Sequence, residues 1–224
     1  MTLFPRFALV FAFVHMLTAC TPQAALIASL LPPGTINLML GNLERVSDEN
    51  RRRVAELEQR GDWHGLASFA ERSLATDRSN ADWWLVAGYA RSQLRDHAAA
   101  TKAYQEVLRL EPDNPAGWHL LAQTHRAAGD ATRAVNVLEH ALLALRDSPL
   151  TYYLLGETYA DLARYDEAAA SYRSAVKIEE RFPAAWFGLA KAYERLGRVT
   201  EARAAQAQLE KLDPRLAQRL RDGS

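Results

Sequence analysis

Few side chains in this sequence are of types that could carry out covalent or metal chemistry, and their spacing does not bring them together. The chain has one cysteine, Cys20, with no second thiol for an internal disulfide and no clustered histidines to complete a metal site. His119 and His125 are six residues apart, so on a helix they would face different sides and could not chelate one ion. The remaining histidines are isolated from one another, at His15, His64, His97 and His140.

Motifs that mark catalytic sites do not occur in the sequence either. It contains no phosphate-binding glycine loop, no Gly-x-Ser-x-Gly turn and no His-Glu-x-x-His pair. Asp161, Asp166 and Glu167 gather where a helix is expected to begin, and capping and the helix dipole account for acidic residues there. We therefore expect a protein that is not an enzyme and has no cofactor and no metal.

The charge and composition of the chain indicate which classes of molecule it can bind. The chain has 27 Lys and Arg residues against 27 Asp and Glu residues, so its formal net charge is zero. A nucleic-acid-binding protein needs a basic surplus to displace counterions from phosphates, and this chain has none. Hydrophobic residues make up 49% of the sequence and charged residues 24%, which is typical of a globular chain.

Residues 1–19 have the pattern of a targeting segment. Arg6 supplies one positive charge, and the apolar run that follows, residues 7–19, is short for a membrane-spanning helix. The run ends in Leu17-Thr18-Ala19-Cys20, which resembles the lipobox of bacterial lipoproteins. An ordinary buried cysteine inside an uncleaved anchor helix is the alternative interpretation of Cys20.

The lipobox resemblance implies a location for the protein. It implies that residues 1–19 are removed as a signal peptide and that Cys20 is lipidated and becomes the first residue of the mature chain. Several acyl chains would anchor the protein stably to a membrane. The mature protein would then lie in the bacterial cell envelope and face the periplasm. Thr21, which is not an aspartate, favours the outer membrane in this resemblance.

A repeat of 34 residues organises the rest of the chain. Large aromatic residues recur at this period at Trp84, Trp118, Tyr152 and Trp186. Small residues follow four positions later at Gly88, Ala122, Gly156 and Ala190, and an unbroken alanine column lies at Ala100, Ala134, Ala168 and Ala202. Small residues at fixed positions allow two helices to approach closely, and a larger side chain there would push them apart.

These columns resemble the tetratricopeptide repeat (TPR), whose period is 34 residues. The resemblance implies an all-α fold, a right-handed solenoid of antiparallel helix pairs. Four full repeats would occupy residues 81–114, 115–148, 149–182 and 183–216, with a degenerate repeat at 47–80, so that the repeat domain spans residues 47–216. Residues 217–224 form a C-terminal tail, although Leu216 and Leu220 could begin a short capping helix.

Residues 20–46 are expected to be a linker followed by a helix. After Pro32-Pro33-Gly34, apolar residues recur at helical spacing, at Ile36, Met39, Leu40, Leu43 and Val46. This apolar stripe could cap the open end of the solenoid, form the seam of a homodimer, or contact a membrane surface.

In the TPR family, the first helices of successive repeats line a groove that binds partner proteins. Carried over to this sequence, the positions one and five residues after the aromatic column are the candidates for contact with a peptide. They are Leu85, His119, Tyr153 and Phe187, then Tyr89, Gln123, Glu157 and Lys191, with Arg126 one turn further. Leu85 and Phe187 could equally pack between neighbouring repeats.

The resemblance therefore implies a non-catalytic scaffold, tethered in the bacterial envelope, that binds a protein or peptide in its groove. It is similar to lipoproteins that help to assemble envelope machines. Two other functions stay open at this point. The chain could be an accessory subunit of an envelope enzyme involved in murein or secretion. If residues 1–20 are not a signal, it could be a cytosolic co-chaperone.

Overall fold

The computed structural model describes residues 45–223, which form one compact unit. The expected signal peptide, Cys20 and the apolar stripe up to Leu43 lie outside the described residues. Within residues 45–223 the chain forms eleven helices and no strand. These are α3 (Asp48–Gln59), α4 (Trp63–Thr76), α5 (Ala81–Gln93), α6 (His97–Leu110), α7 (Pro115–Ala127), α8 (Ala131–Ala144), α9 (Pro149–Asp161), α10 (Tyr165–Ile178), α11 (Pro183–Arg195), α12 (Val199–Leu212) and α13 (Pro214–Arg221).

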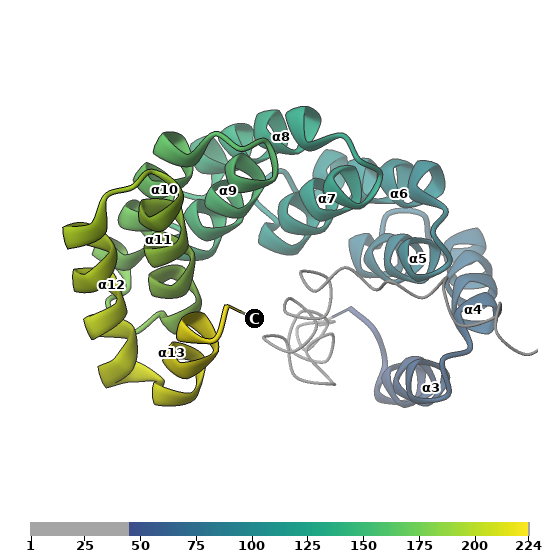
Figure 1. Ribbon diagram of the computed structural model, residues 1–224. Coiled ribbons are helices and arrows are strands. Elements are labelled where there is room, and N and C mark those ends of the chain that lie inside the picture. The colour runs from purple at the N-terminus through teal and green to yellow at the C-terminus, as the bar shows by residue number, and fades with distance from the viewer. Residues whose placement is uncertain (1–44, 224) are drawn as a thin grey trace, which may run out of the picture. The chain divides into compact units, whose positions relative to one another are not determined.

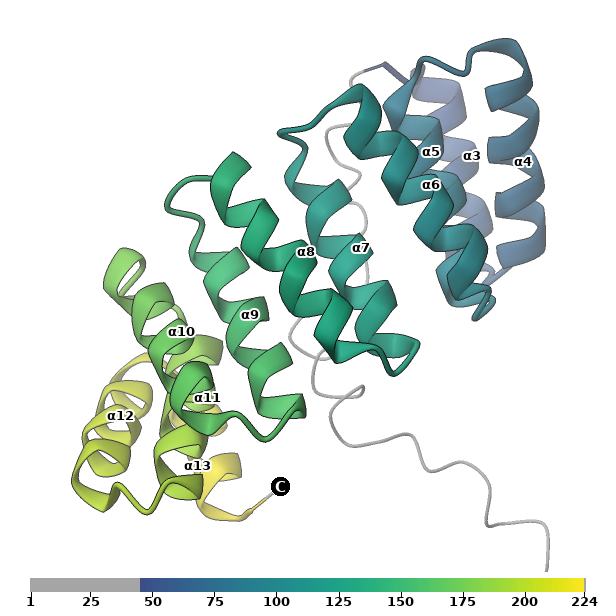
Figure 2. The same ribbon diagram turned by 90° about the horizontal axis from the view of Figure 1, so that it is seen from above.

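The helices of this unit stack in chain order along a curved row (Figure 1), and the same order is seen from above (Figure 2). Each helix packs mainly against the helices that precede and follow it, and contacts also join the first helices of neighbouring pairs, such as α9 and α11. Contacts that join each helix pair only to the neighbouring pairs are typical of a solenoid. The all-α solenoid of helix pairs expected from the 34-residue period is confirmed.

The alanine column lies where the two helices of a pair meet. Ala100, Ala134 and Ala168 have no exposed surface and Ala202 is 3% exposed. In the first pair, Leu66 occupies the equivalent position and is also fully buried. The larger leucine fits there because α3 and α4 lie less closely together than the two helices of the later pairs.

Glycine and tyrosine face each other inside two of the pairs. A methyl group added to Gly88 would lie 2.6 Å from the ring of Tyr104, and one added to Gly156 would lie 2.7 Å from the ring of Tyr172. The equivalent positions hold Ala122 with Leu138, and Ala190 with Gln206. Glycine thus occurs in the column where a tyrosine ring fills the space opposite, and alanine where a smaller side chain does.

The turn within each pair contains one residue with positive φ. In chain order, the residues and their φ angles are Gly61 (65°), Arg95 (59°), Gly129 (81°), Ala163 (55°) and Gly197 (71°). Each lies 34 positions after the one before it. A left-handed backbone costs a side-chain-bearing residue about 1–2 kcal/mol. Arg95 and Ala163 are therefore held in this conformation by the packing of the helices on either side.

The residue that follows this turn caps the second helix in three of the pairs. The carboxylates of Asp62, Asp96 and Asp130 accept a hydrogen bond from the backbone N–H three residues later. In the last two pairs an arginine takes this place and makes no such bond. The guanidinium of Arg164 lies 4.6 Å from the centre of the Tyr159 ring, and that of Arg198 lies 4.7 Å from the centre of the Tyr193 ring.

The aromatic column connects each pair to the turn before it. The indole N–H groups of Trp84, Trp118 and Trp186 donate to backbone carbonyls six residues upstream, in Arg78, Pro112 and Glu180, at 2.8–2.9 Å. Each tryptophan thereby fixes the loop between consecutive pairs. The 34-residue period locates this column in the sequence but does not predict its hydrogen bonds.

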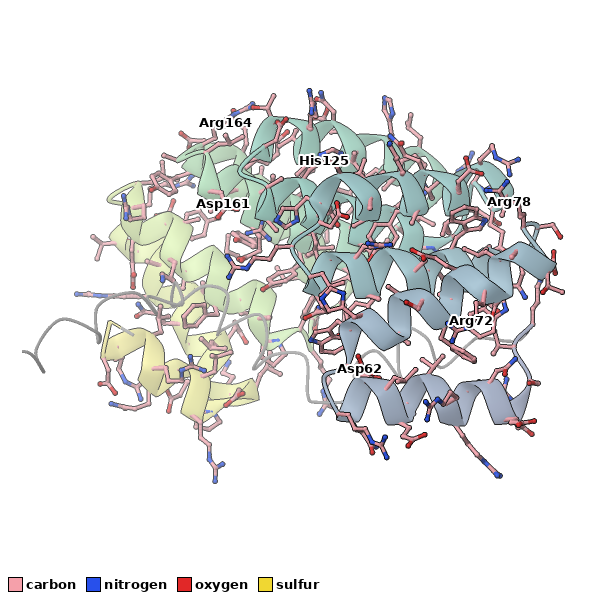
Figure 3. All side chains as sticks on the ribbon, turned by 90° about the vertical axis from the view of Figure 1, so that its right-hand side faces the viewer. Asp62, Arg72, Arg78, His125, Asp161 and Arg164 are labelled. Atoms are coloured by element: carbon pink, nitrogen blue, oxygen red, sulfur yellow. The ribbon has the colours of Figure 1, made fainter. Side chains whose placement is uncertain are left out.

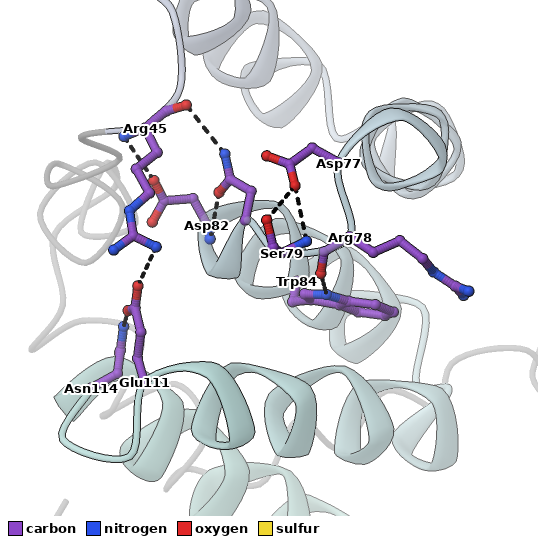
Figure 4. A network of polar contacts seen from close by, with 9 residues as sticks. Arg45, Asp77, Arg78, Ser79, Asp82, Trp84, Glu111 and Asn114 are labelled. Atoms are coloured by element: carbon purple, nitrogen blue, oxygen red, sulfur yellow. Dashed lines mark hydrogen bonds and ion pairs between the residues drawn. The ribbon is translucent and has the colours of Figure 1, made fainter.

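Buried polar groups hold the segment that enters the first helix. The backbone N–H of Arg45 donates to Asp82 at 3.1 Å, and its carbonyl accepts from the amide of Asn80 at 3.2 Å (Figure 4). The Arg45 guanidinium also pairs with Glu111 at 2.9 Å. Val46, next to Arg45, is 3% exposed and joins the core of the first two pairs.

The far end of the described chain is closed by α13. Leu216, Ala217 and Leu220 are buried, and α13 contacts both α12 and α11. Pro214 is the first residue of this helix, and Asp213 caps it through the backbone N–H of Leu216. A short capping helix was expected as one alternative, and it extends across position 216, where the last repeat was expected to end.

Candidate functional site

The nine residues expected to line a groove lie on the first helices α5, α7, α9 and α11. Four of them, one per helix, are buried: Leu85, His119, Tyr153 and Phe187 are between 3% and 9% exposed. Such side chains offer little surface to a partner. The alternative left open for Leu85 and Phe187, that they pack between neighbouring repeats, agrees with this burial.

In this buried row, His119 joins consecutive repeats, whereas the Tyr153 ring packs against aromatic rings of its own repeat. The His119 Nε2 atom lies 2.8 Å from the hydroxyl oxygen of Thr151 on α9. Burial lowers the pKa of His119 to about 4, so the ring is neutral at pH 7. The Tyr153 ring packs 5.1 Å from that of Phe182 and 6.0 Å from that of Tyr172, measured between ring centres.

The second row of candidates is more accessible. Tyr89 and Gln123 are half-buried, and the Tyr89 ring meets Trp63 edge-on at 5.5 Å between centres. Lys191 is exposed, and its ammonium lies 5.4 Å from the centre of the Phe187 ring one turn away. An aromatic group, an amide and a cation are therefore displayed from three different first helices.

The remaining candidates, Arg126 and Glu157, belong to one charged network. The Arg126 guanidinium forms an ion pair with Asp161 at 2.7 Å and lies 3.9 Å from Glu157. The other carboxylate oxygen of Glu157 accepts a hydrogen bond from the hydroxyl of Tyr172 on α10. We refer to Arg126, Glu157, Asp161 and Tyr172 as the central cluster. Its members come from α7, α9 and α10, so it connects two consecutive repeats.

Charges in the central cluster are partly shielded from water. The side chains of Arg126 and Glu157 are 11% and 21% exposed. Burial raises the pKa of Glu157, and Asp161 adds to the rise, whereas the Tyr172 hydroxyl, Arg126 and Lys191 act against it. One cation faces two carboxylates in the cluster, which leaves acceptor capacity on Glu157 for a donor from outside.

Asp161 was attributed from the sequence to a helix start, and that attribution is wrong. It is the last residue of α9, and its carboxylate pairs with Arg126 of the preceding repeat. Figure 3 labels Asp161 and Arg164, which lie at the two ends of the turn between α9 and α10. The spacing of 35 residues between Arg126 and Asp161, one repeat plus one, is the signal that could have identified this pair.

Asp166 and Glu167 do lie in the first turn of α10, as expected. Within the part of the chain that the structure describes, no group of three or more His, Cys, Asp or Glu side chains is placed to hold a metal ion. Among the helices of residues 45–223, none combines the length and the apolar character needed to cross a membrane.

Two protein-family models match the sequence. Residues 93–175 match the model for subunit 3 of the anaphase-promoting complex (cyclosome), and residues 153–217 match a tetratricopeptide-repeat model. The two matched segments overlap and together span more than half of the chain. A search of curated proteins found no match.

Solved structures share the fold at low sequence identity. MamA from Desulfovibrio magneticus RS-1 is 18% identical, with a TM-score of 0.63 over 73% of this chain and 93% of its own. TTC0263, a thermophilic TPR protein of Thermus thermophilus, is 21% identical, with a TM-score of 0.60 over 79% of this chain and 98% of its own. YrrB, described as a TPR protein with an unusual peptide-binding site, is 15% identical, with a TM-score of 0.59 over 81% of this chain and 98% of its own.

Proposed function

Because this chain is a tetratricopeptide-repeat protein, we propose that it is a non-catalytic scaffold that holds a partner protein on the surface of its first helices. The observation that carries the proposal is the central cluster together with Lys191. In the cluster, Glu157 is fixed by Tyr172 and Arg126 and keeps acceptor capacity. Fixed, partly desolvated charges discriminate between partners at little entropic cost.

The chemistry of the site favours a peptide segment with both donor and acceptor groups. Glu157 would accept from an amide N–H or a cation of the partner, and the exposed Lys191 would pair with a carboxylate. Tyr89 and Gln123 extend the same surface towards the first repeats. YrrB, which shares the fold, is described as having a peptide-binding site, and this supports the class of ligand.

Affinity measurements with the partner test this surface. The partner is first identified by crosslinking in native cells, and its affinity is then measured for Glu157→Gln and Lys191→Glu. Each change is expected to weaken binding about tenfold, and Lys191→Glu is expected to alter the salt dependence of association as well. Glu157→Gln keeps an oxygen that can accept from Tyr172, so the fold is preserved.

Lys102→Glu is the matched control because Lys102 is an exposed lysine on the second helix α6. It should bind the partner as the wild type does. Equal affinities for all four proteins would show that the partner binds elsewhere.

For the location of the protein we propose lipidation of Cys20 and retention in the bacterial envelope, facing the periplasm at the outer membrane. The support is the Leu17-Thr18-Ala19-Cys20 sequence after a short apolar run. Cys20→Ser should release the protein from membranes or leave it as an unprocessed precursor, as judged by fractionation and mass spectrometry. An unmodified Cys20 in the wild-type protein would contradict this part of the proposal.

A further inference from the structure

A hollow of about 500 Å³ lies on a different part of the solenoid from the first-helix surface. It is lined by α10, the turn after it, the start of α11 and the second half of α12. Its walls are therefore formed mainly by the second helices of the last two repeats. The volume is in the range of pockets that hold small molecules or parts of peptides, about 300–1,000 Å³.

The charges around this hollow are strongly asymmetric. Arg173, Lys177, Arg181 and Lys211 line it, against a single carboxylate, Glu180. All four cationic residues are exposed. Among the described residues, Arg173, Lys177 and Arg181 form no ion pair, and Lys211 makes only a 3.5 Å hydrogen bond to Gln208. This part of a chain whose net charge is zero thus carries a local surplus of positive charge.

Beneath the cations the lining is apolar. Val176 is 5% exposed, and Trp186 and Leu212 are half-buried. The Trp186 indole is held in place because its N–H donates to the carbonyl of Glu180 at 2.8 Å. An apolar floor below exposed cations suits a ligand with an apolar or aromatic group flanked by negative charge.

The repeat pattern accounts for only part of this positive charge. Lys177 and Lys211 share one repeat position with Arg109, whereas Arg173 and Arg181 have no cationic counterpart in the preceding repeats. If the whole set belonged to the repeat, the preceding junction between second helices would carry it too, 34 residues earlier. The three positions there that correspond to Arg173, Lys177 and Arg181 hold Glu139, Leu143 and Asp147. Lys177 and Lys211 also lie in the last turns of α10 and α12, where the helix dipole favours cations, but Arg173 is mid-helix and Arg181 follows α10.

We infer that this hollow is a second binding site, and that its ligand is an acidic peptide segment of a partner protein that inserts an apolar or aromatic side chain. A membrane surface fits less well because Val176, Trp186 and Leu212 are recessed between two helices, whereas bilayer insertion requires protruding apolar groups. The site is separate from the first-helix surface, so one scaffold could hold two segments at once.

Binding of a synthetic probe to the purified protein comprising residues 20–224 tests the inference. The probe is a short fluorescent peptide of alternating glutamate and phenylalanine, and fluorescence anisotropy reports its affinity. The control probe replaces glutamate with glutamine. We expect the acidic probe alone to bind, and to bind more weakly as salt rises from about 50 to about 500 mM.

Variants locate the binding. The double change Lys177→Glu and Lys211→Glu should weaken the acidic probe about tenfold or more. Gln208→Trp, which fills the hollow without changing its charge, should weaken it as well. Arg203→Glu, an exposed position on the same helix α12 that does not line the hollow, should have no effect, and nor should Lys191→Glu on the first-helix surface.

Three outcomes would overturn the inference. The first is no binding of the acidic probe. The second is an equal loss of affinity in the Lys177/Lys211 and Arg203 variants, which would indicate non-specific attraction. The third is that vesicles containing phosphatidylglycerol bind through Lys177 and Lys211 while the peptide does not. The Lys191→Glu variant is measured both with the partner protein and with the acidic probe. A failure of this inference can therefore be told apart from a failure of the proposed first-helix site.

Discussion

Arg95 and Ala163 lie in the turn between the two helices of a pair and have a left-handed backbone, which glycine would adopt at lower cost. Ala163 has φ 55°, at a position where Gly129 and Gly197 occupy neighbouring repeats. Ala163→Gly should stabilise the protein by up to about 1 kcal/mol, because relief of the left-handed strain exceeds the extra chain entropy of glycine. Ala128→Gly, one residue before the turn with φ −77°, should destabilise it instead. Urea denaturation compares the two, and a loss of stability in both would contradict the strain.

His119 should make stability depend on pH. Its pKa is lowered from 6.5 to about 4 by burial, so the unfolded chain takes up a proton at a higher pH than the folded chain does. Stability from this group is complete above about pH 6.5 and falls as the pH decreases to about 4, by about 3 kcal/mol in total. His119→Gln, which does not titrate, should remove that part of the slope. Urea midpoints of both proteins at about pH 7.5 and about pH 5 measure it; parallel slopes would be the contrary result.

The charged residues were the least predictable from the sequence. Repeat columns place each side chain on a helix face, but they do not say which charges of different repeats meet. Arg126 was recognised as a groove position, whereas its partner Asp161 was not, because the pair depends on the offset between α7 and α9. The burial of His119 and Tyr153 depends on the same offset.

At the scale of paired helices, the match between glycine and tyrosine can be tested by exchange. Gly88→Ala should destabilise by about 1–3 kcal/mol, because the added methyl would lie 2.6 Å from the Tyr104 ring. Adding Tyr104→Leu should restore much of the loss, since the pair then resembles Ala122 with Leu138. The Tyr104 hydroxyl has no hydrogen-bond partner among the described residues, so its removal leaves no unpaired group.

Thermal melts of the two single variants and the double variant form a cycle that isolates the coupling. If the losses of stability in the two single variants add up to the loss in the double variant, the two positions are not coupled. The sequence alone showed that this column holds small residues. It could not show why two are glycines and two are alanines, because that choice depends on the side chain that faces each one.

Over the whole described chain, the fold was predictable because a solenoid is built from local contacts. The 34-residue period places every helix pair, and the neighbours of each pair follow from chain order. The second binding site was not predictable in this way. Two of its four cations, Arg173 and Arg181, have no cationic counterpart in the preceding repeats, and the hollow lies between α10 and α12.

The tryptophan hydrogen bonds bear on how the molecule deforms under load. Trp84, Trp118 and Trp186 each fasten a junction between pairs, whereas Tyr152 makes no such bond within residues 45–223, and Asp147 in the same junction has φ 54°. We therefore expect the junction between α8 and α9 to bend more easily than the three junctions that a tryptophan fastens. Backbone amides at 145–148 should exchange with deuterium faster than those at 111–114. Tyr152→Trp should slow the exchange of amides 145–148, because the indole would supply the missing hydrogen bond. Unchanged exchange would contradict this explanation.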